Sequence, residues 1–116
     1  MKIISLPQLP EEPVSHNPAI RKRVMLRAGE LPHLTNFSQS RFGPGQIAPA
    51  HRHQDMCEVF LVQSGTGVIR IDGTTHPMRP GTCVAIEVGE EHEIENTGAE
   101  DLVLTYFGLK VPNECP

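Results

Sequence analysis

Short apolar runs, separated by turns rich in glycine and proline, limit how this chain can fold. Ten glycines and eleven prolines stand among its 116 residues, about 18% against a usual share of about 12%. Both residues break helices, so the composition excludes a helical bundle. Seven runs rich in Val, Ile, Thr and Phe instead predict β-strands, at residues 24–28, 36–42, 58–63, 68–71, 82–86, 92–95 and 102–107.

The turns between these runs predict an antiparallel arrangement. Asp72-Gly73 directly follows the run at 68–71 and is a strong signal for a tight hairpin with the next segment. There is no sustained helical period and no internal repeat. Many short strands at this spacing indicate a single all-β sandwich or barrel.

The first 19 residues differ from the rest because they hold four prolines. Proline at this density prevents a helix and favours an extended chain. Apolar side chains such as Ile3 and Leu6 would let that chain dock. We therefore expect an extended Pro-rich arm over residues 1–19, lying on its own domain or on a neighbouring subunit, and one β-barrel domain over residues 20–116.

Charge and composition exclude several classes of function. The net charge is −4, aromatic residues make up 4% and there is no Trp, which disfavours nucleic-acid binding. No apolar run approaches the roughly 18 residues of a membrane span or the length of a secretion signal. Three cysteines, Cys57, Cys83 and Cys115, give no disulfide framework. We expect a soluble, cytoplasmic protein without nucleic-acid or membrane partners.

His51 and His53 form a His-x-His pattern, which places two imidazoles on one face of a strand. Glu58 begins an apolar run, where a buried carboxylate needs a partner. Glu58 has the wrong parity to join the histidines on one continuous strand. A hairpin loop over residues 54–57 would resolve this by placing His53 opposite Glu58. The alternative is a solvated strand face that holds no ligand.

His92 is the fourth candidate, because Ile94 shares its face if residues 92–95 form a strand. His92 would then point inward, while Glu93 and Glu95 would face water. The alternative is a core histidine that is satisfied by hydrogen bonds.

The spacing of these residues resembles the two signature motifs of the cupin family. The first motif is matched at every defined position, by Gly45, His51, His53, Glu58 and Gly65. The chain is thus similar to small single-domain cupins of the conserved-barrel (cupin 2) type.

The second cupin motif is matched by Gly81, Gly89, His92 and Asn96, with one departure. The family usually has Pro where this chain has Glu87. We expect Glu87 to be an exposed loop carboxylate, and a contact with substrate at the barrel mouth is the alternative.

The resemblance implies an antiparallel β-barrel of jelly-roll type and a metal site. Its ligands would be His51, His53, Glu58 and His92, holding one divalent transition metal ion. Three imidazoles and a carboxylate suit Mn, Fe, Co, Ni, Cu or Zn, and the ligand types do not choose among these metals.

An apolar pocket should surround the metal and receive a small organic ligand. Phe60 and Val62 share the parity of Glu58, and Ile94 shares that of His92. On the last strand, either Tyr106 or the pair Thr105 and Phe107 must face inward.

The resemblance implies a metal-dependent enzyme, with a dioxygenase or related oxidoreductase as the leading class and an isomerase, decarboxylase or lyase as other classes. The alternative is a non-catalytic module that binds a sugar or another metabolite. Cupins commonly form dimers, so we also expect a homodimer.

The remaining basic and histidine residues fall outside these patterns. Arg21-Lys22-Arg23 fits a solvated strand edge that discourages aggregation, and an anion-binding patch is the alternative. Three histidines are expected in turns or at the surface: His16, His33 and His76.

Overall fold

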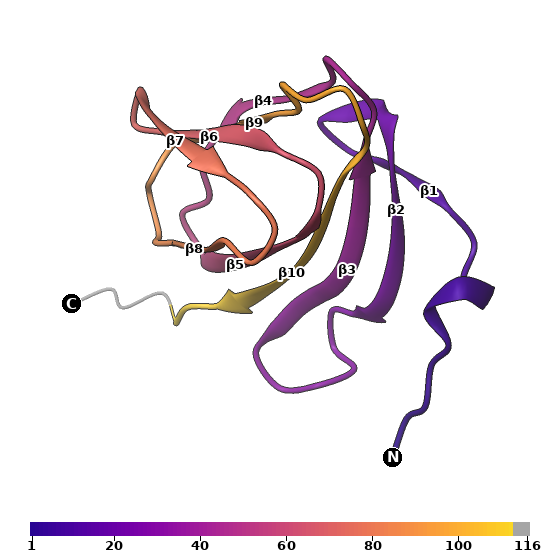
Figure 1. Cartoon of the computed structure of the whole chain (residues 1–116). Coiled ribbons are helices and arrows are strands. Elements are labelled where there is room, and N and C mark those ends of the chain that lie inside the picture. Colours follow the sequence, from indigo (N-terminus) through magenta and orange to yellow (C-terminus); the bar gives the residue numbers. More distant parts are fainter. Residues whose placement is uncertain (113–116) are drawn as a thin grey trace.

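Two antiparallel sheets packed face to face form the computed structural model, which describes residues 1–112 (Figure 1). One sheet has six strands in the order β1-β2-β3-β10-β5-β8, and the other has four in the order β4-β9-β6-β7. The elements are η1 (Leu6–Gln8), β1 (Glu12–Val14), β2 (Asn17–Arg27), β3 (Leu34–Phe42), β4 (Ile47–His51), β5 (Met56–Ser64), β6 (Gly67–Ile71), β7 (Thr74–Met78), β8 (Cys83–Ile86), β9 (His92–Glu95) and β10 (Leu102–Lys110).

The all-β prediction is confirmed, and each of the seven predicted runs overlaps a strand. The hairpin at Asp72-Gly73 joins β6 to β7, and both turn residues have positive φ angles, 48° and 83°. A tight type I′ turn requires these angles. β1 and β4 were not among the predicted strands, and β7 was expected only as the partner segment after the Asp72-Gly73 turn. All three are short and contain proline, so their apolar patterns are weak.

The N-terminal segment forms the first hairpin of the six-stranded sheet, and no separate Pro-rich arm is evident. Residues 6–8 make one turn of 3-10 helix, and β1 pairs antiparallel with β2. The expected boundary between residues 19 and 20 falls inside β2. Proline is compatible with this arrangement, because Pro13 lies on an edge strand and Pro18 lies near the start of β2.

The core lies between the two sheets. From the six-stranded sheet, Phe42, Val62 and Leu104 are buried, and from the four-stranded sheet, Ile69 and Ile94 are buried. Burial alternates along β5 and β9, as the period of a strand requires. This alternation leaves one inner face on each sheet, and the candidate site lies between them.

Within residues 1–112, no helix is long and apolar enough to cross a membrane. Cys115 lies outside the described residues, and within residues 1–112 Cys57 and Cys83 are both free thiols.

Candidate metal centre

Four side chains converge between the sheets, and they are the four that the sequence singled out. Nitrogen atoms of His51, His53 and His92 and a carboxylate oxygen of Glu58 all lie within 4.8 Å of one another. Glu58 Oε1 is 3.2 Å from His53 Nε2 and 3.3 Å from His92 Nε2. This is the proximity that one shared cation requires.

The two sheets contribute different members of the cluster. His51 on β4 and His92 on β9 are cross-strand partners, and their ring centroids are 4.2 Å apart. Glu58 lies on β5 in the opposite sheet, and its side chain is buried. The expected ladder between His53 and Glu58 is therefore wrong: residues 52–55 cross from one sheet to the other, and the two residues meet across the sandwich.

Backbone carbonyls orient two of the imidazole rings. His51 Nδ1 lies 2.9 Å from the carbonyl oxygen of Pro49, and His92 Nδ1 lies 3.2 Å from that of Glu90. A carbonyl only accepts hydrogen bonds, so each Nδ1 carries the proton and donates it. Each Nε2 is left with a free lone pair, the arrangement found for metal-bound histidines.

Two atoms of the cluster have no hydrogen-bond partner among the described residues. They are Glu58 Oε1 and His92 Nε2, and both are fully buried. With His92 protonated at Nδ1, both atoms present lone pairs to each other across 3.3 Å. Buried acceptors in this position need a proton or a cation between them, so the donor set fits a divalent metal ion.

The cluster shifts the pKa values of two of its histidines in opposite directions. Burial, supported by the neighbouring histidines, lowers the pKa of His51. Burial also acts to lower the pKa of His92, but the Glu58 carboxylate and the Glu90 carbonyl outweigh it, and the net pKa is raised. A proton therefore competes with a metal ion more strongly at His92 than at His51.

A pocket of about 180 Å³ opens beside the cluster. It is smaller than the roughly 300–1,000 Å³ of drug-sized ligand sites, so it suits a compact molecule. Its wall combines apolar with polar side chains. Besides the four candidate ligands, it is formed by Val14, Ser15, His16, Lys22, Asn36, Ser40, Phe42, Ala48, Met56, Phe60, Ile94 and Tyr106.

The structure divides the expected lining residues into two groups. Phe60, Ile94 and Tyr106 line the pocket, and the rings of Phe60 and Tyr106 stack with centroids 5.0 Å apart. Val62 is buried in the core and does not reach the pocket. Phe107 lies on the other face of β10, where it meets Phe37 edge to face, so Tyr106 is the residue that faces inward.

The N-terminal hairpin lines the pocket with four residues that the sequence did not predict there: Val14, Ser15, His16 and Lys22. His16 lies in the turn between β1 and β2 and is exposed, as expected, and its ring stacks on that of His51 with centroids 4.1 Å apart. Lys22, expected at a solvated edge, lines the pocket. The alternation of β2 could have predicted the inward position of Lys22, because Lys22 shares its parity with Ile20 and Val24, which are both buried.

Glu87, which replaces the usual proline of the second motif, is exposed and lies outside the pocket. Its backbone N–H donates a hydrogen bond of 2.7 Å to the carboxylate of Glu90. Proline has no N–H and could not make this bond. The substitution therefore exchanges the rigidity of a proline ring for a turn closed by a side chain.

The fold and the site agree with the family comparison. The model of the cupin domain family (Cupin_2) matches residues 39–108. This covers more than half of the chain, so the chain belongs to the cupin family.

Curated relatives match this chain over part of their length. It is 33% identical to the oxalate-binding protein of Thermotoga maritima, over 57% of this chain and 54% of that protein. It is 36% identical to auxin-binding protein 1 of Arabidopsis thaliana, over 53% of this chain and 35% of that protein. The matched part thus spans about half or less of these relatives.

Solved structures share the fold over nearly the whole chain. A predicted oxalate decarboxylase from Thermotoga maritima superposes with a TM-score of 0.88 at 22% identity, covering 95% of this chain and all of that one. KdgF from a Halomonas species gives a TM-score of 0.80 at 16% identity, covering 99% of both chains.

Proposed function

We propose that this cupin is a metal-dependent enzyme that acts on a small organic molecule bound in the pocket. One observation carries the proposal: the two unpaired buried atoms, Glu58 Oε1 and His92 Nε2, lie in a cluster of donors that borders a ligand-sized pocket. A purely structural metal site is closed by its protein ligands, whereas a catalytic site keeps positions open. The pocket beside the cluster favours the second kind.

The ion would be one divalent transition metal, held by His51, His53, Glu58 and His92. When bound, it would supply Lewis acidity or a redox centre and would gather the substrate beside the protein groups. The chain itself orients the imidazoles through the Pro49 and Glu90 carbonyls. Phe60 and Ile94 line the pocket and would limit the access of bulk water.

Within this proposal, a dioxygenase is the leading reaction class. The apolar side chains of Phe60, Ile94 and Phe42 line the same pocket as the donor set, and an apolar wall favours entry of dioxygen over water. Other proteins similar to this chain carry different activities in their names, including a dimethylsulfoniopropionate lyase from Ruegeria pomeroyi and a sugar phosphate isomerase of the cupin superfamily from Silicibacter pomeroyi. A lyase, isomerase or decarboxylase would use the same pocket.

The second candidate is a binding module without turnover. The names of two relatives support it, since one is an oxalate-binding and the other an auxin-binding protein. The small pocket would hold such a ligand equally well.

Oxygen consumption and product analysis separate these candidates. Protein loaded with Mn, Fe or Cu is incubated with catechols, flavonols and 1,3-diketones, and dissolved oxygen is recorded. Oxygen uptake that is lost in His51→Ala supports the dioxygenase. Product formation without oxygen uptake would contradict the dioxygenase assignment and indicate a non-redox reaction instead. Tight ligand binding with no product would establish the binding module.

We also propose that the protein is a homodimer. β1 is an edge of the six-stranded sheet, and the neighbouring N-terminal side chains of Ile3 and Ile4 are exposed. Unpaired edge groups and exposed apolar side chains favour association with a second copy. Light scattering at a monomer mass of 12.8 kDa would contradict this.

A further inference from the structure

We infer that the ligand is a small carboxylic acid that carries a carboxylate beyond its metal-binding group, and that Lys22 binds this second carboxylate. The inference rests on the proposed metal site and deepens it by naming the class of ligand. The family match begins at residue 39, whereas Lys22 belongs to the N-terminal hairpin. The ligand preference would therefore depend on a part of this chain that the family match does not cover.

Strand alternation directs Lys22 into the pocket. Lys22 pairs across the sheet with Ser40, which is buried and lines the same pocket. The flanking residues Arg21 and Arg23 have the opposite parity, and they contact the backbone carbonyls of residues 11 and 9 on the outer side. The basic run Arg21-Lys22-Arg23 is thus divided between the two faces of the sheet.

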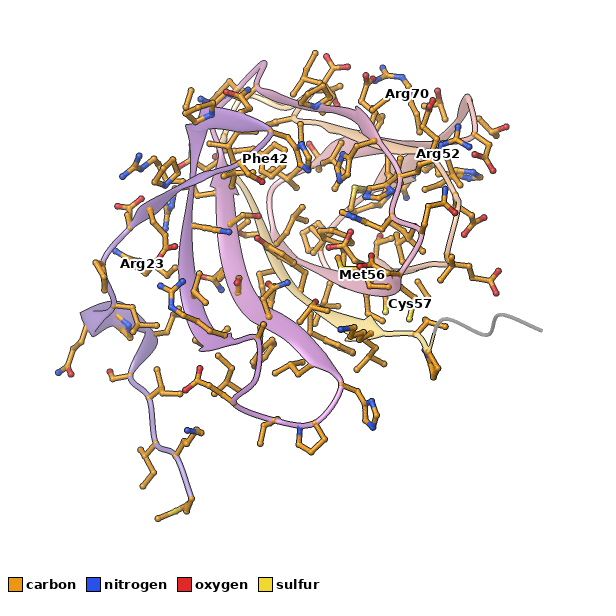
Figure 2. All side chains as sticks on the ribbon, turned by 180° about the vertical axis from the view of Figure 1, so that it is seen from behind. Arg23, Phe42, Arg52, Met56, Cys57 and Arg70 are labelled. Carbon is orange, nitrogen blue, oxygen red and sulfur yellow. The ribbon has the colours of Figure 1, made fainter. Side chains whose placement is uncertain are left out.

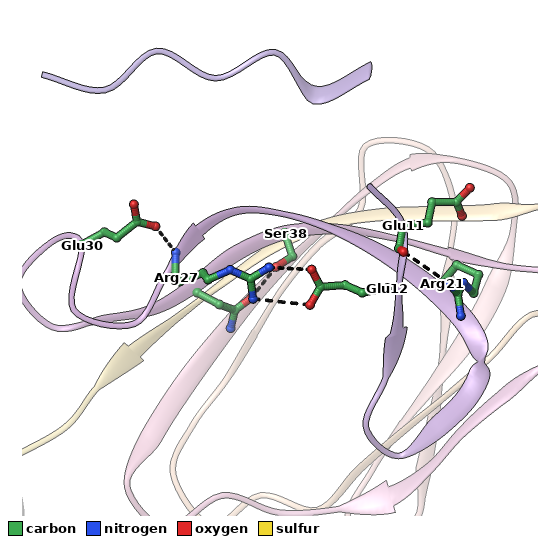
Figure 3. A network of polar contacts seen from close by, with 7 residues as sticks. Glu11, Glu12, Arg21, Arg27, Glu30 and Ser38 are labelled. Carbon is green, nitrogen blue, oxygen red and sulfur yellow. Dashed lines mark hydrogen bonds and ion pairs between the residues drawn. The ribbon is translucent and has the colours of Figure 1, made fainter. Parts of the chain in front are cut away.

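No anionic side chain neutralises Lys22 within the described residues. Its ammonium makes no salt bridge in residues 1–112. Its cross-strand partner is Glu12, but Arg27 holds that carboxylate through contacts of 2.6 and 3.4 Å (Figure 3). Lys22 is therefore half-buried and has no ion-pair partner among the described residues.

The charges around the pocket then favour a dianion. Glu58 contributes one negative charge, a divalent ion two positive charges and Lys22 one more. The remaining charge of +2 is balanced by a ligand with two carboxylates. Ser40 places a hydroxyl beside Lys22 on the same wall, and hydroxyl and ammonium groups both donate hydrogen bonds to a carboxylate.

Lactate and malate provide a matched pair of probes. Both chelate a metal through a carboxylate and the adjacent hydroxyl, but only malate has a second carboxylate. Zinc-loaded wild-type protein is titrated with each acid by calorimetry, and Lys22→Met and Arg23→Met are titrated in parallel. Metal content and thermal melting are measured on each sample, so that loss of the ion or of the fold is detected.

We expect wild-type protein to bind malate at least about tenfold more tightly than lactate, the range for a charged hydrogen bond. Lys22→Met should remove this preference and leave lactate affinity within about twofold. Arg23→Met, on the outer face, should retain the preference. If Lys22→Met still prefers malate to lactate, the role assigned to Lys22 is wrong, and the proposed metal site is unaffected. If zinc-loaded wild-type protein binds neither acid, the proposed small-molecule site fails together with the inference.

Discussion

His51 and His92 face each other across the β4–β9 ladder, with ring centroids 4.2 Å apart, although they belong to different motifs. Glu58 approaches this pair from the other sheet, and its Oε1 lies 3.3 Å from His92 Nε2. The candidate metal centre thus draws its side chains from both sheets and depends on their packing. The same packing creates the pocket in which we expect the ligand to bind.

Replacing a candidate ligand should empty the metal site. We expect protein purified without a histidine tag to hold one ion per chain, and His51→Ala or Glu58→Gln to weaken metal affinity by at least about tenfold, by analogy with the 10- to 100-fold losses of outer-shell variants, and so to lower the metal content. Elemental analysis measures the change. His76→Ala is the matched control, because His76 is exposed on β7. Equal metal content in all four proteins would contradict the assignment.

The metal-free protein should be most stable near the ordinary histidine pKa of about 6.5. The raised pKa of His92 stabilises the fold below this value, and the contribution is lost as pH rises through the folded pKa. The lowered pKa of His51 contributes stability above about pH 6.5, where the imidazole is neutral. That contribution is lost as pH falls from about 6.5 through the folded pKa.

Urea denaturation of the metal-free protein between about pH 5 and pH 8 measures this dependence. His92→Gln should flatten the decline on the alkaline side, and His51→Gln should flatten the decline on the acidic side. If both variants follow the wild-type profile, neither histidine titrates with the shifted pKa.

Tyr106 provides a direct optical probe of the pocket. It is the only tyrosine, and the chain has no tryptophan. Burial raises its pKa to about 12, so phenolate absorbance should appear only well above the ordinary value of about 10. Stability should accordingly fall as pH rises between these values, because only the unfolded chain ionises there. Phenolate absorbance that rises near pH 10 while circular dichroism remains native would contradict this burial.

Asn96 should contribute more to stability than other polar residues. Its side chain is fully buried, donates to the carbonyl oxygens of Phe42 and Glu100 at 2.9 and 2.8 Å, and accepts from the Gly98 N–H. Asn96→Ala leaves these groups unsatisfied and should lower the free energy of unfolding by about 3 kcal/mol. Urea denaturation measures the loss. Asn17→Ala is the control, because it removes an exposed hydrogen bond to the Ile47 carbonyl, and it should lower the free energy of unfolding by less than about 1 kcal/mol. Equal losses of stability in the two variants would exclude a special role for Asn96.

Gly65 should not tolerate a side chain, because β5 and β10 approach each other there. A Cβ atom at this position would collide with the Asp101 carbonyl and lie 2.8 Å from Leu102 Cα. Gly29→Ala is the matched control, since Gly29 has a similar positive φ angle but open space around it. Thermal unfolding should show a clearly larger loss for Gly65→Ala. Similar losses would mean that backbone conformation alone requires this glycine.

Much of the fold could be predicted because it depends on local patterns. The alternation within β5 and β9 and the Asp72-Gly73 turn are encoded by residues adjacent in sequence. The short strands β4 and β7 lacked an apolar pattern, so only their partners in the sheet define them. Side-chain parity was informative within each strand but could not show that residues 52–55 cross between sheets.

Side chains on the surface are placed by neighbours that sequence patterns do not reveal. Arg70 on β6 contacts Glu93 and Glu95 on β9 at 2.7 and 2.9 Å, and Figure 2 shows it far from Met56 and Cys57 at the start of β5. Glu93 and Glu95 were expected to face water. They do lie on the outer, partly exposed face of β9, and there they form ion pairs with Arg70, because pairing of β6 with β9 brings opposite charges together.

The sequence by itself determined the all-β class, the strand periodicity and the identities of the four candidate metal ligands, because spacing along one chain encodes these features. Only the tertiary structure decided that Tyr106 and not Phe107 faces the pocket, and that His16 and Lys22 reach it. These placements depend on strand pairing and on the packing of two sheets. Such contacts join residues far apart in the chain, and no local pattern fixes them.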